Sequence, residues 1–123
     1  MTAPVISIVD DDHSVRESLA RLVRSVGLGV RVFGSAEEFL GAGPEFETAC
    51  LILDIRMPGM SGIELQRQLQ SSERTLPIIF ITAHGSDAGV RASALDAGAV
   101  DYLLKPLRED EVLRAIDAAL NPK

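Results

Sequence analysis

The chain has 123 residues, of which 46% are apolar and 24% are charged, and its formal net charge at pH 7 is −6. A chain of this length can bury one hydrophobic core, and its acidic balance argues against a broad nucleic-acid-binding surface. No apolar run approaches the roughly 20 residues that cross a membrane, and the first residues lack the basic and apolar regions of a signal peptide. We therefore expect a cytoplasmic protein with one domain over residues 1–123 that binds neither nucleic acid nor membrane directly.

Apolar runs alternate with segments of helical periodicity five times along the chain. The predicted strands cover residues 5–9, 30–33, 50–53, 78–81 and 99–104. The predicted helices run from about 15 to 26, 36 to 40, 63 to 69, 87 to 97 and 109 to 120. Three helix starts carry Ser-x-x-Glu, the pattern of a capping box: Ser14 with Glu17, Ser35 with Glu38, and Ser61 with Glu64.

Five strand–helix units predict an α/β fold with a parallel sheet covered by helices on both faces. The first, third and fourth strands are almost uniformly Val, Ile and Leu, which is typical of central strands, and Cys50 should be a buried thiol in the third. The second strand carries Arg31 and the fifth carries Asp101, as edge strands can. This distribution favours the flavodoxin-like, doubly wound order 2-1-3-4-5, in which ligands bind at the carboxyl ends of the strands between the first and third.

Four of the five predicted strands deliver a polar side chain to that edge. The first strand is followed by Asp10-Asp11-Asp12, the third by Asp54, the fourth by Thr82 and the fifth by Lys105. Because neighbouring strands lie about 4.8 Å apart, Asp10 or Asp11 should converge with Asp54, with Thr82 and Lys105 on the flank. Taken singly they have ordinary explanations: an Asp after a strand is often a turn former or helix cap, a Thr caps, and a Lys is solvated. Together the carboxylates would repel one another unless positive charge compensates. Lys105 would supply one positive charge, and a bound Mg²⁺ would supply the rest.

The motifs at the strand ends resemble those of the receiver domains of two-component response regulators. They are Val9-Asp10-Asp11, the stretch DIRMPGMSG over residues 54–62, Ile81-Thr82-Ala83 and Lys105-Pro106. The resemblance covers essentially the whole chain with every motif in order. The stretches Thr82-Ala83-His84-Gly85 and Ala97-Gly98-Ala99-Val100-Asp101-Tyr102 are most similar to the FixJ-type subgroup.

The resemblance implies a phosphorylation switch and not an enzyme with its own substrate. Asp54 would be the phosphoacceptor for a sensor histidine kinase or a phosphotransfer protein. Asp11 would bind Mg²⁺, or Mn²⁺ in its place, directly, while Asp10 would contribute through water or a weaker contact. The backbone carbonyl of Arg56 would complete the protein ligands. Asp12 matches no family role and is a candidate cap of the first helix.

Other residues would bind the phosphoryl group and relay its presence. Lys105 would pair first with Asp54 and then with a phosphoryl oxygen, while the Thr82 hydroxyl and the Ala83 amide would donate hydrogen bonds to the group. Tyr102 would change rotamer together with Thr82, and the Lys105–Pro106 peptide bond would be cis. The relayed change would reach the fourth helix, fifth strand and fifth helix, which could then form a homodimer or control a partner.

The resemblance also assigns a tuning role to Arg56 and His84, which come two residues after Asp54 and Thr82. These positions border the phosphoryl group in receivers and help to set how long it survives. The alternative is that both are solvated loop residues.

Two other classes of protein are alternative interpretations of these motifs. A haloacid-dehalogenase-type phosphatase also begins with Asp-x-Asp after a strand, but that reading makes Asp10 the nucleophile and leaves Asp54 unexplained. The chain is short for that class and lacks a later acidic pair after a strand. A flavin-binding electron carrier shares the fold, but the acidic cluster would repel the phosphate of FMN, and no phosphate-binding loop follows the first strand.

Overall fold

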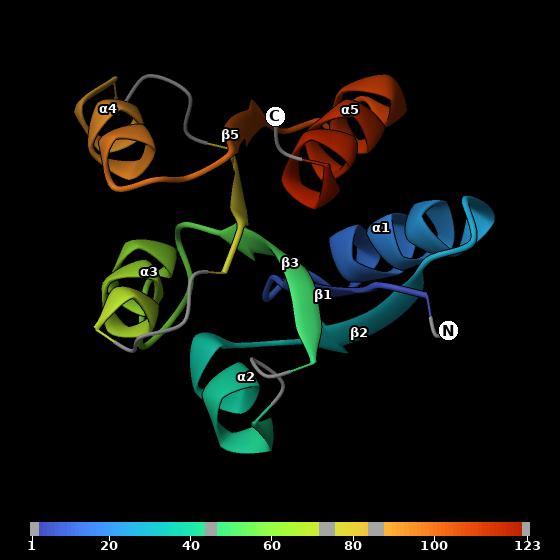
Figure 1. Cartoon of the computed structure of the whole chain (residues 1–123). Coiled ribbons are helices and arrows are strands. Elements are labelled where there is room, and N and C mark those ends of the chain that lie inside the picture. Colours follow the sequence, from blue (N-terminus) through green and yellow to red (C-terminus); the bar gives the residue numbers. More distant parts are fainter. Residues whose placement is uncertain (1–2, 44–46, 72–75, 84–87, 122–123) are drawn as a thin grey trace.

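The computed structural model describes residues 3–43, 47–71, 76–83 and 88–121. Within these residues five parallel strands form one sheet in the order β2-β1-β3-β4-β5 (Figure 1). The strands are β1 (Val5–Val9), β2 (Gly29–Phe33), β3 (Thr48–Asp54), β4 (Ile78–Thr82) and β5 (Asp101–Leu104). The helices are α1 (His13–Ser25), α2 (Ala36–Ala42), α3 (Gly62–Gln70), α4 (Ala88–Asp96) and α5 (Glu109–Leu120). The flavodoxin-like order expected from strand composition is therefore confirmed.

Helices cover the sheet on both faces, with α1 and α5 on one side and α2, α3 and α4 on the other (Figure 1). Because side chains alternate along a strand, each central strand contributes to two cores. Ile6, Ile8 and Ile52 pack toward α1 and α5, whereas Leu53 and Phe80 belong to the core under α2, α3 and α4. This double burial explains why the sequences of β1, β3 and β4 are almost continuously apolar.

The single cysteine lies inside the first of these cores. Cys50 is fully buried in β3, and this burial raises the pKa of its thiol to about 12. A thiol with so high a pKa carries little of the reactive thiolate at neutral pH, so Cys50 has a packing role, as expected. Among the described helices, none has the length and apolar character needed to cross a bilayer.

The helix caps agree with the sequence at two of the three predicted starts. Ser61 and Glu64 form the complete capping box, with reciprocal hydrogen bonds of 3.0 and 3.1 Å. Ser35 caps α2 by accepting from the Glu38 amide, although the Glu38 carboxylate accepts from Gly34 instead of Ser35.

The capping box predicted at Ser14 and Glu17 is wrong, because α1 begins two residues earlier than that box requires. Its N-cap is Asp12, whose Oδ1 accepts from the backbone amides of Ser14 and Val15 at 2.9 and 3.5 Å. The Ser14 hydroxyl also donates to the same oxygen at 2.7 Å. A carboxylate at the cap meets the positive end of the helix dipole, so Asp12 takes the role suggested for it as a candidate cap.

Candidate functional site

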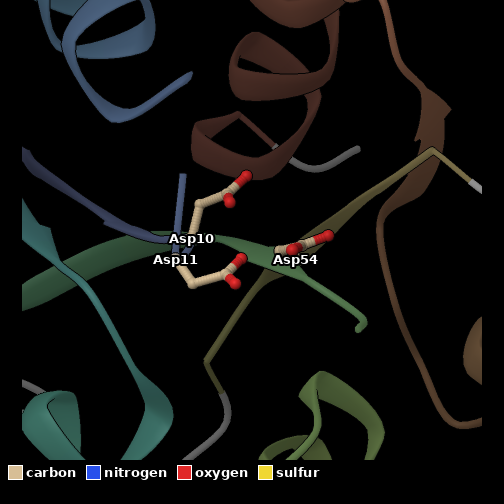
Figure 2. A group of neighbouring side chains, drawn as sticks. All are labelled: Asp10, Asp11 and Asp54. Carbon is tan, nitrogen blue, oxygen red and sulfur yellow. The ribbon is translucent and has the colours of Figure 1, made fainter. Parts of the chain in front are cut away.

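Three carboxylates meet at the carboxyl edge of the sheet, where β1 and β3 lie side by side. Asp10 and Asp11 follow β1, and Asp54 is the last residue of β3. One carboxylate oxygen from each residue lies within 4.8 Å of the others, and Figure 2 shows the side chains projecting into one small region. Asp10 and Asp54 are buried while Asp11 is exposed, so the cluster is open to solvent on the side of Asp11.

Asp10 is held from several directions. Its amide donates to the Phe33 carbonyl at 3.1 Å, and its own carbonyl accepts from the Arg16 guanidinium at 2.7 Å. Its Oδ1 accepts from the Asp12 amide at 2.9 Å. Its Oδ2 is fully buried and lies 2.9 Å from the Lys105 ammonium, an ion-pair distance, yet it receives no well-directed hydrogen bond from the described residues. This oxygen therefore has capacity for a further positive ligand.

Lys105 supplies the positive charge beside the carboxylates. Its amide donates to the Thr82 carbonyl at 2.8 Å, which fixes the residue just beyond β5, and its peptide bond to Pro106 is cis, as the resemblance implied. Its Nζ lies 2.9 Å from Asp10 Oδ2 and 3.6 Å from Asp54 Oδ1. The ammonium is thus closer to Asp10 than to Asp54, the partner that the resemblance implied. Burial alone would lower the pKa of Lys105, but Asp10 and Asp54 outweigh it and raise that pKa.

Burial and the neighbouring charges also change the pKa of Asp54. Burial raises its pKa most, the negative charge of Asp10 raises it further, and Lys105 only partly opposes them, so the pKa of Asp54 is about 6. One ammonium cannot balance three carboxylates. The oxygen-only donor set and the buried Asp10 oxygen without a hydrogen bond fit a hard divalent cation such as Mg²⁺, which prefers carboxylate ligands and retained waters.

Comparison with known proteins identifies the architecture around these side chains. Residues 6–117 match the model of the response regulator receiver domain family. The chain belongs to this family. The assignment agrees with the receiver resemblance and not with the phosphatase or flavin-carrier alternatives, and it identifies the chain as a receiver of the two-component type.

The relatives of this receiver include regulators of the FixJ type. It is 52% identical over 118 residues to the response regulator protein TodT of Pseudomonas putida, covering 96% of this chain and 52% of TodT. It is 41% identical over 119 residues to the transcriptional regulatory protein FixJ of Rhizobium meliloti, covering 97% of this chain and 58% of FixJ. The receiver thus spans about half the length of the curated relatives it matches.

The solved structures extend this similarity to the fold. The crystal structure of FixJ-N superposes with a TM-score of 0.87 at 39% identity, covering 100% of this chain and 98% of that one. Both comparisons place this receiver in the FixJ-like subgroup.

Three of the residues singled out by the receiver resemblance line one cavity. Thr82 ends β4 and Tyr102 lies in β5, and both line a cavity of about 530 Å³ together with Arg56. Thr82 and Tyr102 are buried, and the Tyr102 ring packs against Phe80 at a centroid distance of 6.5 Å. The ring is therefore already turned into the protein in this structure. Ala83 is exposed next to Thr82, and His84 lies outside the described residues.

The expected motif included Gly62 but gave it no role. Gly62 is the first residue of α3, and its amide donates to the Ile55 carbonyl at 2.9 Å. A Cβ at Gly62 would lie 2.3 Å from the Asp54 carbonyl oxygen, so no side chain fits there without moving the backbone of Asp54. The available signal was a glycine, a poor helix former, directly after the N-cap Ser61.

Arg16 and Glu37 were also missed by sequence reasoning. Arg16 reaches back from α1 to the Asp10 carbonyl, and Glu37 of α2 accepts from the Met60 amide at 2.9 Å, which ties down the loop after β3. Both contacts join segments whose relative positions are set by the fold, so no local sequence pattern predicts them.

Proposed function

We propose that this receiver accepts a phosphoryl group on Asp54 from the phosphohistidine of a sensor histidine kinase or a phosphotransfer protein. The observation that carries the proposal is the position of Asp54. It is a buried carboxylate at the end of the central strand, grouped with Asp10 and Asp11, and 3.6 Å from the Lys105 ammonium. In the transfer, an Asp54 oxygen forms the new bond to phosphorus while the donor's phosphorus–nitrogen bond breaks and its electron pair remains on the histidine.

The surrounding residues suit the electrostatic demands of that transfer. A phosphoryl group passes through a loose, in-line transition state with charge on its equatorial oxygens, so positioning and cations matter more than acid–base groups. Asp10, Asp11, Asp54 and the Arg56 carbonyl would hold Mg²⁺, or Mn²⁺ in its place. The metal, when bound, supplies charge neutralisation for the incoming phosphoryl oxygens.

Three further residues would hold the transferred group. Lys105 is close enough to both Asp10 and Asp54 to turn from the first toward a phosphoryl oxygen, because its flexible stem carries a compact point charge. Thr82 is the last residue of β4 and Ala83 directly follows it, so the Thr82 hydroxyl and the Ala83 amide at this edge would donate hydrogen bonds to the group. Arg56 and His84 would then tune its loss by slow autodephosphorylation, which makes this chain a timed switch and not a metabolic enzyme.

The phosphoryl group would be read out on the face formed by α4, β5 and α5. Thr82 and Tyr102 share one cavity, so a turn of Thr82 toward the phosphoryl group changes the packing around the buried Tyr102 ring. Leu95 and Leu104 are 36% and 52% exposed on this face, and Leu104 lines a groove together with Arg91 and Glu111. Exposed leucines next to charges of both signs are suited to a homodimer or to an output partner.

We further propose that residues 1–123 make up one receiver domain that works in the cytoplasm, with partners that are proteins and not nucleic acid or membrane.

Intact-mass measurement tests phosphoryl transfer. The protein is incubated with acetyl phosphate in the presence of Mg²⁺ or of a chelator. We expect the wild type to gain one phosphoryl group with Mg²⁺ and Asp54→Asn to gain none. Equal labelling with the chelator would contradict the role of the metal, and equal labelling of Asp54→Asn would contradict the acceptor assignment.

A further inference from the structure

The helix α4 is loosely packed along its N-terminal half. Ala94, in the C-terminal half, is its only buried side chain among the residues described. Residues 88–93 are exposed except for the half-buried Val90. Val90 borders the cavity that Thr82 and Tyr102 line. On the other side, Gly89, Val90 and Ser93 border a second cavity of about 260 Å³ against α3.

The C-terminal end of α4 is instead fastened to α3 by two glutamine side chains. The Gln66 amide nitrogen donates to the Ala94 carbonyl at 3.2 Å, and Gln66 is only 3% exposed. The Gln70 amide nitrogen donates to the Ala97 carbonyl. Residues four apart share one helix face, so both glutamines reach α4 from the same side of α3.

Of these two contacts, the Gln66 bond is the costly one to break. A buried amide that loses its partner retains its desolvation penalty, so displacement of Ala94 would leave Gln66 unsatisfied inside the core. The segment after α4 is fixed as well. The Ala99 amide donates to the Ala94 carbonyl at 3.1 Å, and the Val100 amide donates to the Ile78 carbonyl of β4 at 2.7 Å.

We infer that Gln66 and Gln70 form a tether between α3 and α4 that makes the C-terminal end of α4 its fixed end. The N-terminal half, which borders the two cavities, is then the part that moves. The tether is a property of the resting protein. Its consequence for signalling rests on the proposed function: phosphorylation swings the N-terminal half of α4 about Ala94 and Ala97 instead of shifting the whole helix.

Amide hydrogen exchange of the unphosphorylated protein tests the tether directly. Gln66→Leu keeps the side-chain volume and removes the donor, and Gln70→Ala removes the second donor at an exposed position that does not threaten folding. Gln68→Ala is the matched control, since Gln68 is exposed on the same helix.

We expect the amides of Ala97, Gly98 and Ala99 to exchange roughly five- to tenfold faster in Gln66→Leu, as the loss of one hydrogen bond implies. A smaller increase should follow in Gln70→Ala and none in Gln68→Ala, with strand β3 as the internal reference. Unchanged exchange at these amides in both Gln66→Leu and Gln70→Ala would overturn the tether.

A second measurement adds beryllofluoride, a phosphoryl mimic, with Mg²⁺ and follows backbone NMR shifts. In the wild type, shifts within α4 should concentrate at Gly89, Val90 and Arg91, and in Gln66→Leu they should spread to Ala94 and beyond. Equal shifts in both halves of wild-type α4 would contradict the fixed end. An absence of shifts at Asp54 and Thr82 would instead count against the proposed function, while the exchange experiment would still decide the tether.

Discussion

At the scale of single residues, burial and the neighbouring carboxylates make the ionised Asp54 side chain destabilising when no metal ion is bound. Its pKa is about 6 in the folded protein against an ordinary value of 3.8, so between these values the folded state binds more protons than the unfolded state. The metal-free protein should therefore lose stability as the pH rises from about 4 to about 6, and it should not recover this loss at higher pH.

The substitution Asp54→Asn should remove this pH dependence. Without metal, we expect it to raise the free energy of unfolding by about 1–2 kcal/mol above pH 6 and to change it little near pH 4. Urea unfolding at both pH values measures the difference, provided that the protein remains folded at the lower one. A variant that is less stable than the wild type at pH 7 would show that burial and the neighbouring carboxylates do not destabilise the ionised Asp54 side chain.

Asp11 offers a second residue-scale prediction, because it is the exposed member of the cluster and is not paired with Lys105 in the structure. Asp11→Ala should weaken Mg²⁺ binding at least tenfold, and without metal it should be neutral or slightly stabilising because repulsion is relieved. The chain has no Trp, so calorimetry or NMR titration is the suitable method. The matched control is Glu17→Gln, an exposed acid on α1, and equal affinity of Asp11→Ala and this control would exclude Asp11 as a ligand.

At the scale of elements, the cap of α1 distinguishes the observed helix start from the predicted one. Asp12→Ala should lower the stability of the protein by about 1 kcal/mol, since it removes the acceptor for the amides of Ser14 and Val15. Asp12→Asn keeps a capping oxygen and controls for the lost charge, so it should cost less. A thermal melt in which Ser14→Ala is more damaging than Asp12→Ala would favour the capping box that the structure does not show.

Some element bounds and helix caps of this protein follow from local sequence patterns, and others do not. The bounds of β1 and α5 followed from apolar runs and periodicity, and Ser61 formed the complete box because no rival cap precedes α3. At α1, Asp12 and Ser14 are both possible N-caps. Asp12 is the one observed, and its amide also donates to the Asp10 carboxylate. Strand β3 covers Thr48–Asp54 and so extends beyond the predicted range 50–53 at both ends, with Asp54 paired to Ile81.

The site could be predicted as a set of residues but not as a set of contacts. Parallel topology alone brings the ends of β1, β3, β4 and β5 to one edge, which is why Asp10, Asp54 and Lys105 were found together. Lys105 Nζ lies 2.9 Å from Asp10 Oδ2 and 3.6 Å from Asp54 Oδ1. A difference this small between two carboxylates cannot be predicted from sequence. The steric role of Gly62 and the tether of Gln66 depend on packing between elements, which sequence periodicity does not predict.

At the scale of the whole molecule, phosphorylation should shift an existing equilibrium and change the face formed by α4, β5 and α5. The phosphoryl group adds about −1.5 to −2 units of charge and three strong acceptors, and several charge-assisted hydrogen bonds can provide the several kcal/mol that such a shift requires. Because Tyr102 is already buried, its response should be a change of packing with Thr82 and not entry from solvent.

Beryllofluoride with Mg²⁺ should therefore change NMR signals at Tyr102 and in α4, and sedimentation should reveal any self-association through this face. Thr82→Ala should still be phosphorylated at Asp54 but should lose most of the distant response. A full response of α4 in Thr82→Ala would exclude Thr82 as the relay, and shifts confined to the Asp54 surroundings in the wild type would contradict the switch itself.

Chemical localisation of the phosphoryl group is the most direct test of Asp54 as the phosphoacceptor. The protein is phosphorylated with acetyl phosphate and Mg²⁺, the acyl phosphate is reduced with borohydride, and the modified residue is located by tandem mass spectrometry. We predict that the reduced product is found at Asp54, with Asp10 and Asp11 unmodified. A product at Asp10, or labelling that persists at the wild-type level in Asp54→Asn, would contradict the claim.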